Sequence, residues 1–403
     1  MPRNFTPIDD IPSPSTALTR VDLNSPVENG MIKDNRRFVR HAETVRDLSD
    51  ANHRVVLLAH QGRPGRDDFY PLEQHASVLA EHVHRDVEYC PDTVGKNPSE
   101  AVEDLDPGSI LLLENVRMTE AELIERSPEE HAETSFVKAL ARLGDVYVGD
   151  AYSSAHRSHA SIVGLPQAMD SVFAGRVMAA EYRANSAIQS RSFDGPVTMV
   201  LGGTKADDLF RVMEGVSDTV DTFLMGGVTG ELALRAQGFD LGYDVRDTEL
   251  FDALWASEQS RIREILDRFG DRIVLPVDLA FEDDRGRRGE ISVEEISKDR
   301  PYLDVGSETG RRFRREVKRS AAVFVKGALG VFEDDRFSQG TVGVLRAIAA
   351  ADAFSVVGGG DTSRAVDLYD LDPAAFDHLS IAGGAYVRAL AGESLPGVAV
   401  LQQ

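Results

Sequence analysis

Short apolar runs alternate with longer segments of helical periodicity in the first half of the chain. The runs at residues 54–59, 87–90, 109–113 and 145–148 predict strands, and the segments 36–51, 71–84 and 129–143 predict helices. A strand followed by a helix and another strand forms a βαβ unit, and such units build parallel sheets. The first half is therefore expected to be an α/β domain.

The second half repeats this pattern. Strands are predicted at residues 197–201, 222–225, 272–277, 321–325 and 354–357. Between the halves, residues 174–190 predict one long helix, and the polar connector 191–196 follows it. These two segments mark the domain boundary. The charged stretch 282–289 is expected to be a surface loop.

Length and charge narrow the class of protein. A chain of 403 residues is longer than one hydrophobic core ordinarily supports, so two domains are expected. Its net charge of −23 argues against nucleic-acid binding, because a binding face for nucleic acid would be basic. Anionic ligands must then be bound by local positive clusters. Seven lysines against 37 arginines in so acidic a chain indicate adaptation to high salt.

The chain is expected to be a soluble cytoplasmic protein. Cys90 is the only cysteine, which excludes an intrachain disulfide and a cysteine-rich zinc site and fits a reducing compartment. Residues 1–19 are polar, and no apolar run approaches the ~18 residues that a membrane span needs. Neither a signal peptide nor a membrane anchor is expected.

The most informative stretch is the apolar strand 197–201, which leads into Gly202, Gly203 and Lys205. Glycines have no Cβ, so their backbone N–H groups can approach anionic oxygens, and a helix over 206–215 would turn its N-terminus to the same charge. The alternative is a tight turn with a surface lysine. Because lysine is scarce here, phosphate binding is the favoured interpretation.

Other glycines cluster where strands of the second half should end, at residues 226–227, 327 and 330, 358–360 and 383–384. Ligands of open α/β sheets bind outside the carboxyl ends of strands, so these clusters predict one nucleotide-sized crevice. Asp361 follows the glycines 358–360 and is a candidate ligand for Mg²⁺ held by phosphates. Alternatively, Asp361 only caps a helix.

Basic residues in the first half also lie near predicted strand ends. They are Arg20, Arg37, Arg63 and Arg117, with the histidines of the segments 60–64 and 156–159. Each arginine alone is explained by a surface ion pair, but together they predict a pocket that binds phosphate or carboxylate. No second pair of ligands accompanies His156 and His159, so zinc is not expected. Neither a GxSxG nor a Walker motif occurs, which disfavours serine hydrolases and P-loop kinases.

In this order, the motifs resemble those of the phosphoglycerate kinase family, and the resemblance covers nearly the whole chain. The matching segments are 20–26 (RVDLNSP), 60–64 (HQGRP), 112–117 (LLENVR), 150–159 (DAYSSAHRSH), 275–278 (LPVD), 330–333 (GVFE), 358–362 (GGGDT) and 395–397 (LPG).

The resemblance implies an α/β fold of two doubly wound, Rossmann-like parallel-sheet domains joined by a helix, with a cleft between them. Residues 1–173 would form the domain for 3-phosphoglycerate, 174–196 the interdomain helix and connector, and 197–403 the nucleotide-binding domain. The last residues are candidates for packing back on the first domain.

The resemblance also implies a role for each matching residue. Arg37 and Lys205 would be catalytic. The acid substrate would be bound by Asp22, Leu23, Asn24, Arg37, His60, Gln61, Gly62, Arg63, Arg117 and Arg157. The nucleotide would be bound by Lys205, Lys326, Glu333, Gly359, Gly360, Asp361 and Thr362, with Mg²⁺ on Asp361.

The implied reaction is reversible phosphoryl transfer between 1,3-bisphosphoglycerate and ADP, giving 3-phosphoglycerate and ATP, in glycolysis and gluconeogenesis. A carboxylate with a pKa of about 4 is already ionised at neutral pH, so no general base is needed. Catalysis would rest on positioning, on charge neutralisation and on closure of the cleft against water. A monomer is favoured over an oligomer.

Departures from the family pattern gather on the nucleotide side. Leu209 stands where a second lysine is usual, Lys326 replaces an asparagine, and the segments 226–229 and 380–384 are altered. Lys326 either replaces the lost charge or pairs with a carboxylate such as Asp361. Two rival functions stay open: a phosphoglycerate-kinase-like binding protein without transfer activity, and a kinase of a related anionic carboxylate.

If the acidic composition reflects life at high salt, repulsion among carboxylates should destabilise the fold at low ionic strength. The Debye length reaches about 30 Å at 0.01 M salt, so the repulsion is then long-ranged. We expect the melting temperature to rise with added salt, which thermal melts followed by circular dichroism would measure. A melting temperature that does not change from 0.01 M upward would contradict the high-salt interpretation.

Overall fold

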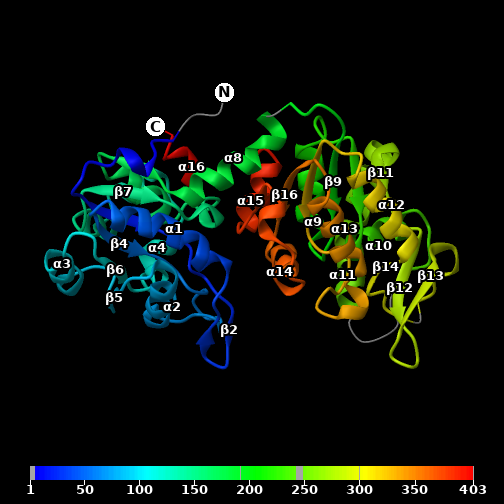
Figure 1. Ribbon diagram of the computed structural model, residues 1–403, viewed down its shortest axis with the longest axis horizontal. Helices are drawn as coiled ribbons and strands as arrows, with labels where there is room; N and C mark the ends of the chain where they lie inside the picture. The colour runs from blue at the N-terminus through cyan, green and yellow to red at the C-terminus, as the bar shows by residue number, and fades with distance from the viewer. Residues whose placement is uncertain (1–4, 191, 242–247, 299, 403) are drawn as a thin grey trace. The chain divides into compact units, whose positions relative to one another are not determined.

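A computed structural model describes residues 5–190, 192–241, 248–298 and 300–402 of the chain (Figure 1). The chain folds into two compact units, Met1–Arg183 with Ser394–Gln403, and Ala184–Glu393. It passes from the first unit to the second within α8 (Arg176–Ser190). The last helix, α16 (Pro396–Ala399), belongs to the first unit, where the N–H of Gly397 donates to the carbonyl of Ala155 at 2.8 Å.

The first unit is built on a six-stranded parallel sheet. Its strands lie in the order β5 (Val87–Cys90), β6 (Ile110–Leu113), β4 (Arg54–Leu58), β1 (Thr16–Arg20), β7 (Val146–Gly149) and β8 (Val172–Ala174). In register, Leu18 of β1 pairs with Val56 and Tyr147. Every residue of β1, β6 and β7 is buried, as expected for strands that are covered on both faces.

Helix α1 shows why the helices of this unit form where they do. The side chain of Asn35 accepts a hydrogen bond from the N–H of Arg37 and caps the helix, and Phe38, Ala42 and Val45 form its buried face. Besides α16 and the start of α8, the helices of this unit are α1 (Arg36–Asp50), α2 (Glu73–Val83), α3 (Lys96–Glu103), α4 (Glu120–Leu123), α5 (Pro128–Ala132), α6 (Ser135–Ala141) and α7 (Leu165–Gln167). Strand β2 (Val27–Glu28) pairs with β3 (Met31–Ile32).

Two expectations for this unit were wrong. The predicted helix over 129–143 is two helices, because Ser127 forms a capping box at the start of α5 and Thr134 caps a new helix, α6. The strand β1 was not predicted, although it lies in the middle of the sheet. Its sequence, TALTR, has too few apolar residues to show as a strand, yet all five residues are buried.

The second unit has its own six-stranded parallel sheet and a small antiparallel sheet. The large sheet has the order β11 (Ile273–Val274), β10 (Thr222–Met225), β9 (Val197–Leu201), β15 (Ala322–Lys326), β16 (Phe354–Gly358) and β17 (His378–Leu379). Its helices are α9 (Ala206–Gly215), α10 (Gly227–Ala236), α11 (Thr248–Phe269), α12 (Ser307–Val317), α13 (Gln339–Ala349), α14 (Gly360–Leu368) and α15 (Gly384–Leu390).

The predicted surface loop at 282–289 is the turn of a β-hairpin: residues 283–287 lie outside strands, and only Glu282 and residues 288–289 belong to the two strands. Strands β12 (Asp278–Glu282) and β13 (Arg288–Ser292) pair antiparallel, and β14 (Asp304–Val305) pairs with the other side of β12. The carboxylate of Asp283 accepts the N–H groups of Arg285 and Arg287 and closes the turn. The two strands were not predicted, because the exposed face of the hairpin carries charged residues and the sequence there contains no long apolar run.

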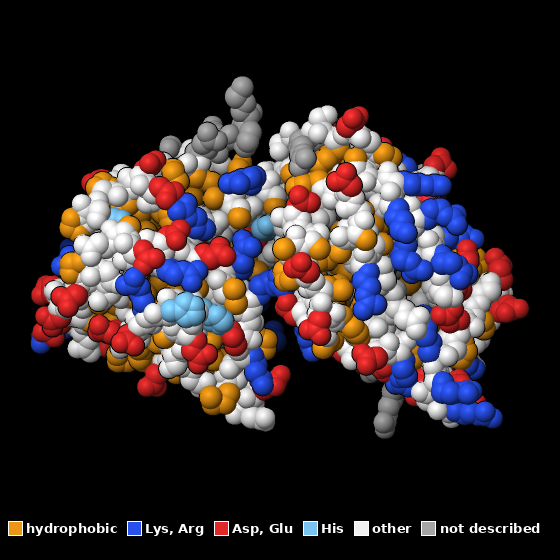
Figure 2. All heavy atoms as spheres, in the orientation of Figure 1, with side chains coloured by type: hydrophobic (Ala, Val, Ile, Leu, Met, Phe, Trp, Pro, Cys, Tyr) orange, Lys and Arg blue, Asp and Glu red, His pale blue; other side chains and the backbone are white. Residues whose placement is uncertain are grey.

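Acidic and basic side chains are interspersed over the face of the molecule that Figure 2 shows. Many arginines form exposed ion pairs, such as the two bonds of 2.7 Å between Arg176 and Asp9. Among the described residues, no helix is long and apolar enough to cross a membrane.

Candidate active site

In each unit, the polar and glycine-rich segments follow the carboxyl ends of parallel strands. In the first unit these segments follow β1, β4, β6 and β7, and in the second unit they follow β9, β10, β15 and β16. In each sheet, the order in which strands are added reverses its direction beside the central strand. The loops on the two sides of this switch point run apart and leave a crevice. Two candidate sites result, one in each unit.

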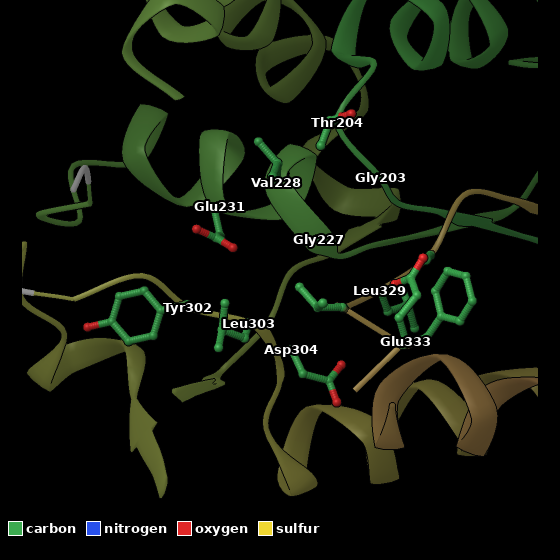
Figure 3. Close-up of a pocket in the computed structure, with 14 residues that line it drawn as sticks. Gly203, Thr204, Gly227, Val228, Glu231, Tyr302, Leu303, Asp304, Leu329 and Glu333 are labelled. Carbon is green, nitrogen blue, oxygen red and sulfur yellow. The ribbon is translucent and has the colours of Figure 1, made fainter. Parts of the chain in front are cut away.

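The second unit contains a pocket of about 260 Å³ (Figure 3). Helix α10 contributes Val228 and Glu231 on one side, and Leu303 and Asp304 lie on the other side. Tyr302, Leu329, Phe332 and Glu333 complete much of the lining. Apolar walls with carboxylates among them suit a flat heterocyclic base that is attached to a sugar with hydroxyl groups. Of these residues, only Glu333 was predicted as a ligand from the sequence.

The glycines beside this pocket do not act as predicted. The N–H groups of Gly202 and Gly203 donate to the carbonyls of Lys326 and Ala328, at 2.9 and 2.7 Å. A Cβ atom on Gly202 would overlap the backbone of Ala328, so glycine is needed there for the approach of two loops. The expectation that these two N–H groups bind a phosphate was wrong, because the neighbouring loop already takes them.

A phosphate-sized anion has a better position at the start of α14. Gly359 precedes this helix with a φ of 103°, and the Nζ atom of Lys326 lies 3.4 Å from where a Cβ on Gly359 would stand. Thr362 lies in the first turn and accepts the N–H of Gly327 at 3.2 Å. A lysine beside a helix N-terminus is a suitable environment for an anion.

The other predicted nucleotide ligands lie around this point. Lys205 is exposed and immediately precedes α9, Gly360 begins α14, and the exposed Glu333 lies 3.4 Å from Arg364. The side chain of Asp361, the predicted Mg²⁺ ligand, lies outside the described part of the structure. The described residues contain no group of three His, Cys, Asp or Glu side chains that could hold a metal ion.

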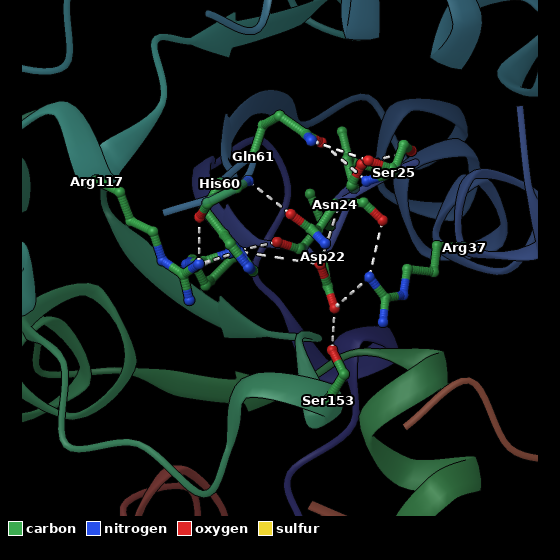
Figure 4. A network of polar contacts seen from close by, with 12 residues as sticks. Asp22, Asn24, Ser25, Arg37, His60, Gln61, Arg117 and Ser153 are labelled. Atoms are coloured by element: carbon green, nitrogen blue, oxygen red, sulfur yellow. Dashed lines mark hydrogen bonds and ion pairs between the residues drawn. The ribbon is translucent and has the colours of Figure 1, made fainter. Parts of the chain in front are cut away.

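In the first unit, Asp22 is the centre of a polar network (Figure 4). Its buried carboxylate lies 3.5 Å from Arg37 and 3.9 Å from His60, and it accepts hydrogen bonds from the Ser153 hydroxyl and the N–H of Asn24. Burial alone would raise the pKa of Asp22, but Arg37 and these hydrogen bonds hold it well below its usual value. The carboxylate is therefore charged throughout the neutral range.

Arg20 determines which nitrogen of His60 carries the proton. Its guanidinium lies 3.2 Å from Nδ1 of His60. Because a guanidinium only donates, Nδ1 accepts and the proton is on Nε2. Burial lowers the pKa of His60 well below its usual value, and Arg117, Arg20 and Arg37 lower it further. His60 is thus a neutral N–H donor near neutral pH.

Three loops are joined around this network. The N–H of Gly62 donates to the side chain of Asn24 at 2.7 Å, Arg37 donates to the carbonyl of Asn24 at 2.7 Å, and Arg117 donates to the carbonyl of Gly62 at 2.5 Å. The loops that follow β1, β4 and β6 therefore move as one body.

Arg117 is a buried arginine with an unsatisfied donor among the described residues. It is 6% exposed, and within the described residues its Nε atom has no hydrogen-bond partner. Burial lowers its pKa to about 10, and the nearby positive charges of Arg20 and Arg157 also lower it. An anion bound here would pair with Arg117 and reduce the repulsion among the three guanidinium groups.

Most residues predicted for the acid substrate lie in this network or beside it. Asp22, Asn24, Arg37, His60, Gln61, Gly62 and Arg117 are joined by the contacts above and by the bond from Ser25 to Gln61. Arg157 is half-buried near Arg117, and Arg63 is exposed next to Gly62. Leu23 contributes only its backbone, because its side chain is in the core.

Sequence analysis missed two members of the network. Ser153 lies inside the DAYSSAHRSH motif, but a serine there shows no sign of contacting Asp22. Glu122 is fully buried and accepts the N–H and hydroxyl of Ser161, whose oxygen in turn accepts from Arg20. A glutamate in a polar segment predicts an exposed position, so no pattern indicated this one.

Three comparisons show what the chain is similar to. The family model of phosphoglycerate kinase matches residues 8–393. A phosphoglycerate kinase of Halorubrum lacusprofundi is 58% identical over 399 residues, covering 99% of this chain and 98% of the relative. Another, of Haloarcula marismortui, is 54% identical over 400 residues, covering 99% and 100%. The solved structure of phosphoglycerate kinase from Pyrococcus horikoshii OT3 superposes with a TM-score of 0.92 at 33% identity, covering 98% of each chain.

Protonation of His75 should make the stability of this unit depend on pH. Its Nε2 donates to Oε1 of Gln61 at 3.0 Å, since that oxygen also accepts the N–H of Ser25. Burial lowers the pKa of His75 to about 4. Above pH ~6.5 the residue is neutral in both states, and below it the unfolded chain binds the proton first, so the unfolding free energy falls toward pH ~4.

We expect wild type to lose up to about 1.4 kcal/mol more per pH unit than His75→Gln between pH 6.5 and 4. Denaturant unfolding at each pH would measure both proteins. Equal pH slopes would show that His75 does not carry this dependence.

Proposed function

The chain belongs to the phosphoglycerate kinase family, and from that membership we propose how its residues divide the work of reversible phosphoryl transfer between 1,3-bisphosphoglycerate and ADP, giving 3-phosphoglycerate and ATP. The observation that carries the acid-substrate assignment is the buried guanidinium of Arg117, whose pKa is lowered by the positive charges of Arg20 and Arg157 and whose Nε is unpaired among the described residues. Such a group is stabilised by an anion.

We assign 3-phosphoglycerate to the network around Asp22. Arg63, Arg117 and Arg157 would bind the phosphate, since the planar guanidinium can form two hydrogen bonds to it. His60 would donate its Nε2–H to an anionic oxygen, and the permanently charged Asp22 would accept from the substrate hydroxyl, together with Asn24. Gln61 and Gly62 would hold the loop that carries Arg63.

We assign the nucleotide to the second unit. The base and ribose would occupy the pocket beside α10, with Glu333 on the ribose hydroxyls. The phosphates would lie at the start of α14, held by Gly359, Gly360, Thr362 and Lys326. Mg²⁺ would supply further neutralisation of phosphate charge, with Asp361 as its protein ligand. A single carboxylate fits this ion, because Mg²⁺ is usually bound by one or two carboxylates, waters and substrate phosphates.

The reaction needs no general base, because the attacking carboxylate is already ionised at neutral pH. Arg37 would neutralise that carboxylate, and Lys205 would neutralise the transferring phosphoryl group while the reacting oxygens are held in line. We propose that residues 1–173 carry the acid site, that 197–403 carry the nucleotide site and that 174–196 connect them. We further propose a cytoplasmic enzyme that works at high salt.

A coupled assay with 3-phosphoglycerate and Mg·ATP tests this function directly. Turnover in this assay excludes the rival binding protein without transfer activity. A protein that binds 3-phosphoglycerate but shows no turnover would support that rival.

Replacing Arg157 or Arg63 with alanine should remove a charge-assisted contact to the acid substrate. The loss is worth about 1.5–3 kcal/mol, or about 10- to 150-fold in the KM for 3-phosphoglycerate, with the KM for ATP unchanged. Steady-state kinetics with each substrate varied would measure both constants. Arg85→Ala removes an exposed arginine that pairs with Asp50 and serves as the control. An equal rise of the KM for ATP would contradict the division into two sites.

Lys326→Asn should lower turnover, because it removes the positive charge beside the phosphates at α14. Loss of one such contact corresponds to about a tenfold effect or more. Lys318→Asn, which changes an exposed lysine after α12, should leave turnover unchanged. Turnover that Lys326→Asn does not change would exclude this role.

A further inference from the structure

His41 lies outside the sequence motifs that match the family and connects two of them, 20–26 and 150–159. It lies on α1, one turn after Arg37, and is 1% exposed. Its Nε2 is 3.2 Å from the backbone N of Asp22, and its Nδ1 is 2.7 Å from Oδ2 of Asp150. A backbone N–H only donates, so Nε2 is the acceptor of this hydrogen bond. The ring proton is therefore on Nδ1, which donates a hydrogen bond to Asp150.

Asp150 is itself held from the other side. Its second oxygen, Oδ1, accepts the N–H groups of Val177 and Met178 at 2.9 and 3.2 Å, in the first turn of α8. Gly175 packs so closely on this carboxylate that a Cβ would overlap it. The carboxylate therefore has one orientation, and it gives the ring of His41 one orientation as well.

The contact to Asp22 matters because of where Asp22 stands. This residue follows β1, and its side chain faces Arg37, Ser153 and His60. A buried backbone N–H without an acceptor costs free energy, so without His41 the segment would shift toward another hydrogen-bond partner. The ring of His41 prevents this shift, because its Nε2 accepts the hydrogen bond from the N–H of Asp22.

We infer that His41 is a positioning residue for the acid substrate: its Nε2 accepts the N–H of Asp22 and fixes that backbone so that the carboxylate is aligned for 3-phosphoglycerate, while the bond from Nδ1 to Asp150 stabilises the fold. His41 touches neither substrate nor reacting atoms. The inference rests on the proposed assignment of the acid site to this network.

Two substitutions separate the two hydrogen bonds of the ring. The amide nitrogen of an asparagine stands where Nδ1 stands, so His41→Asn keeps the donor to Asp150 and leaves the N–H of Asp22 unpaired. The amide oxygen of a glutamine stands where Nε2 stands, so His41→Gln keeps the acceptor for Asp22 and loses Asp150. Thr44→Val is the matched control, because Thr44 lies three residues along α1, is fully buried and accepts the N–H of Arg176 without contacting Asp22.

Calorimetric titration with 3-phosphoglycerate alone, KM values for both substrates and melting temperatures would be measured for all four proteins. We expect His41→Asn to weaken binding of 3-phosphoglycerate about five- to tenfold and to leave the KM for ATP unchanged. His41→Gln should bind within about twofold of wild type while it melts at a lower temperature. Thr44→Val should lose stability only.

Three results would overturn the inference. The first is equal binding of 3-phosphoglycerate by the asparagine and glutamine variants, the second is a loss in Thr44→Val as large as that in His41→Asn, and the third is binding by His41→Asn that equals that of wild type. The proposed function is judged separately by the wild type. If it binds and turns over 3-phosphoglycerate while His41→Asn behaves normally, only the inference fails. A wild type that does neither removes both.

Discussion

Burial of the Arg20 guanidinium at the end of the central strand constrains the first unit more than any other interaction. A buried charge without partners would destabilise the fold by several kcal/mol, so its surroundings must supply acceptors. Ser161, the carbonyl of Val21 and Nδ1 of His60 do so, and Glu122 holds Ser161 in turn. The tautomer of His60, the path of the 160–164 segment and the excess of positive charge near Arg117 all follow from this one side chain.

The two sites are built by different means. Side chains with matched donors and acceptors build the acid site, so that replacing one of them leaves a buried partner unpaired. Backbone contacts between glycine-containing loops, such as the bond from Gly203 to the carbonyl of Ala328, shape much of the nucleotide side. A site shaped by backbone tolerates substitution of neighbouring side chains. The departures from the family pattern at Leu209, Lys326 and Ala382 lie on that side. This location is the one expected if a site that is shaped by backbone tolerates changes of side chain better than a site that is built from side chains.

Sequence periodicity predicted most strands and the class of fold, because strands buried on both faces are apolar runs and helices repeat every 3.6 residues. It failed where tertiary contacts decide the structure: β1 is a central strand without an apolar run, and the hairpin β12–β13 carries charges on an exposed face. Motifs predicted the residues around Asp22, since the ends of parallel strands meet at one edge. They could not predict Ser153, Glu122 or His41, because a contact such as that of Ser153 with Asp22, 131 residues away, or of Glu122 with Ser161, 39 residues away, leaves no local pattern.

An acidic protein that binds anions must overcome its own field, and the use of arginine is explained by the range over which each interaction acts. At 1 M salt the Debye length is about 3 Å, so both the repulsion from distant carboxylates and the attraction of cations that do not contact the anion directly are screened. When a guanidinium contacts a phosphate or carboxylate directly, the distance between the groups does not exceed the Debye length, so the guanidinium keeps its two hydrogen bonds. The ability of a guanidinium to form two short hydrogen bonds to one carboxylate is also used on the surface, where Arg176 binds Asp9 through two bonds. If the protein works at high salt, as proposed above, screening removes the conflict between a net charge of −23 and anionic substrates and favours arginine in both places.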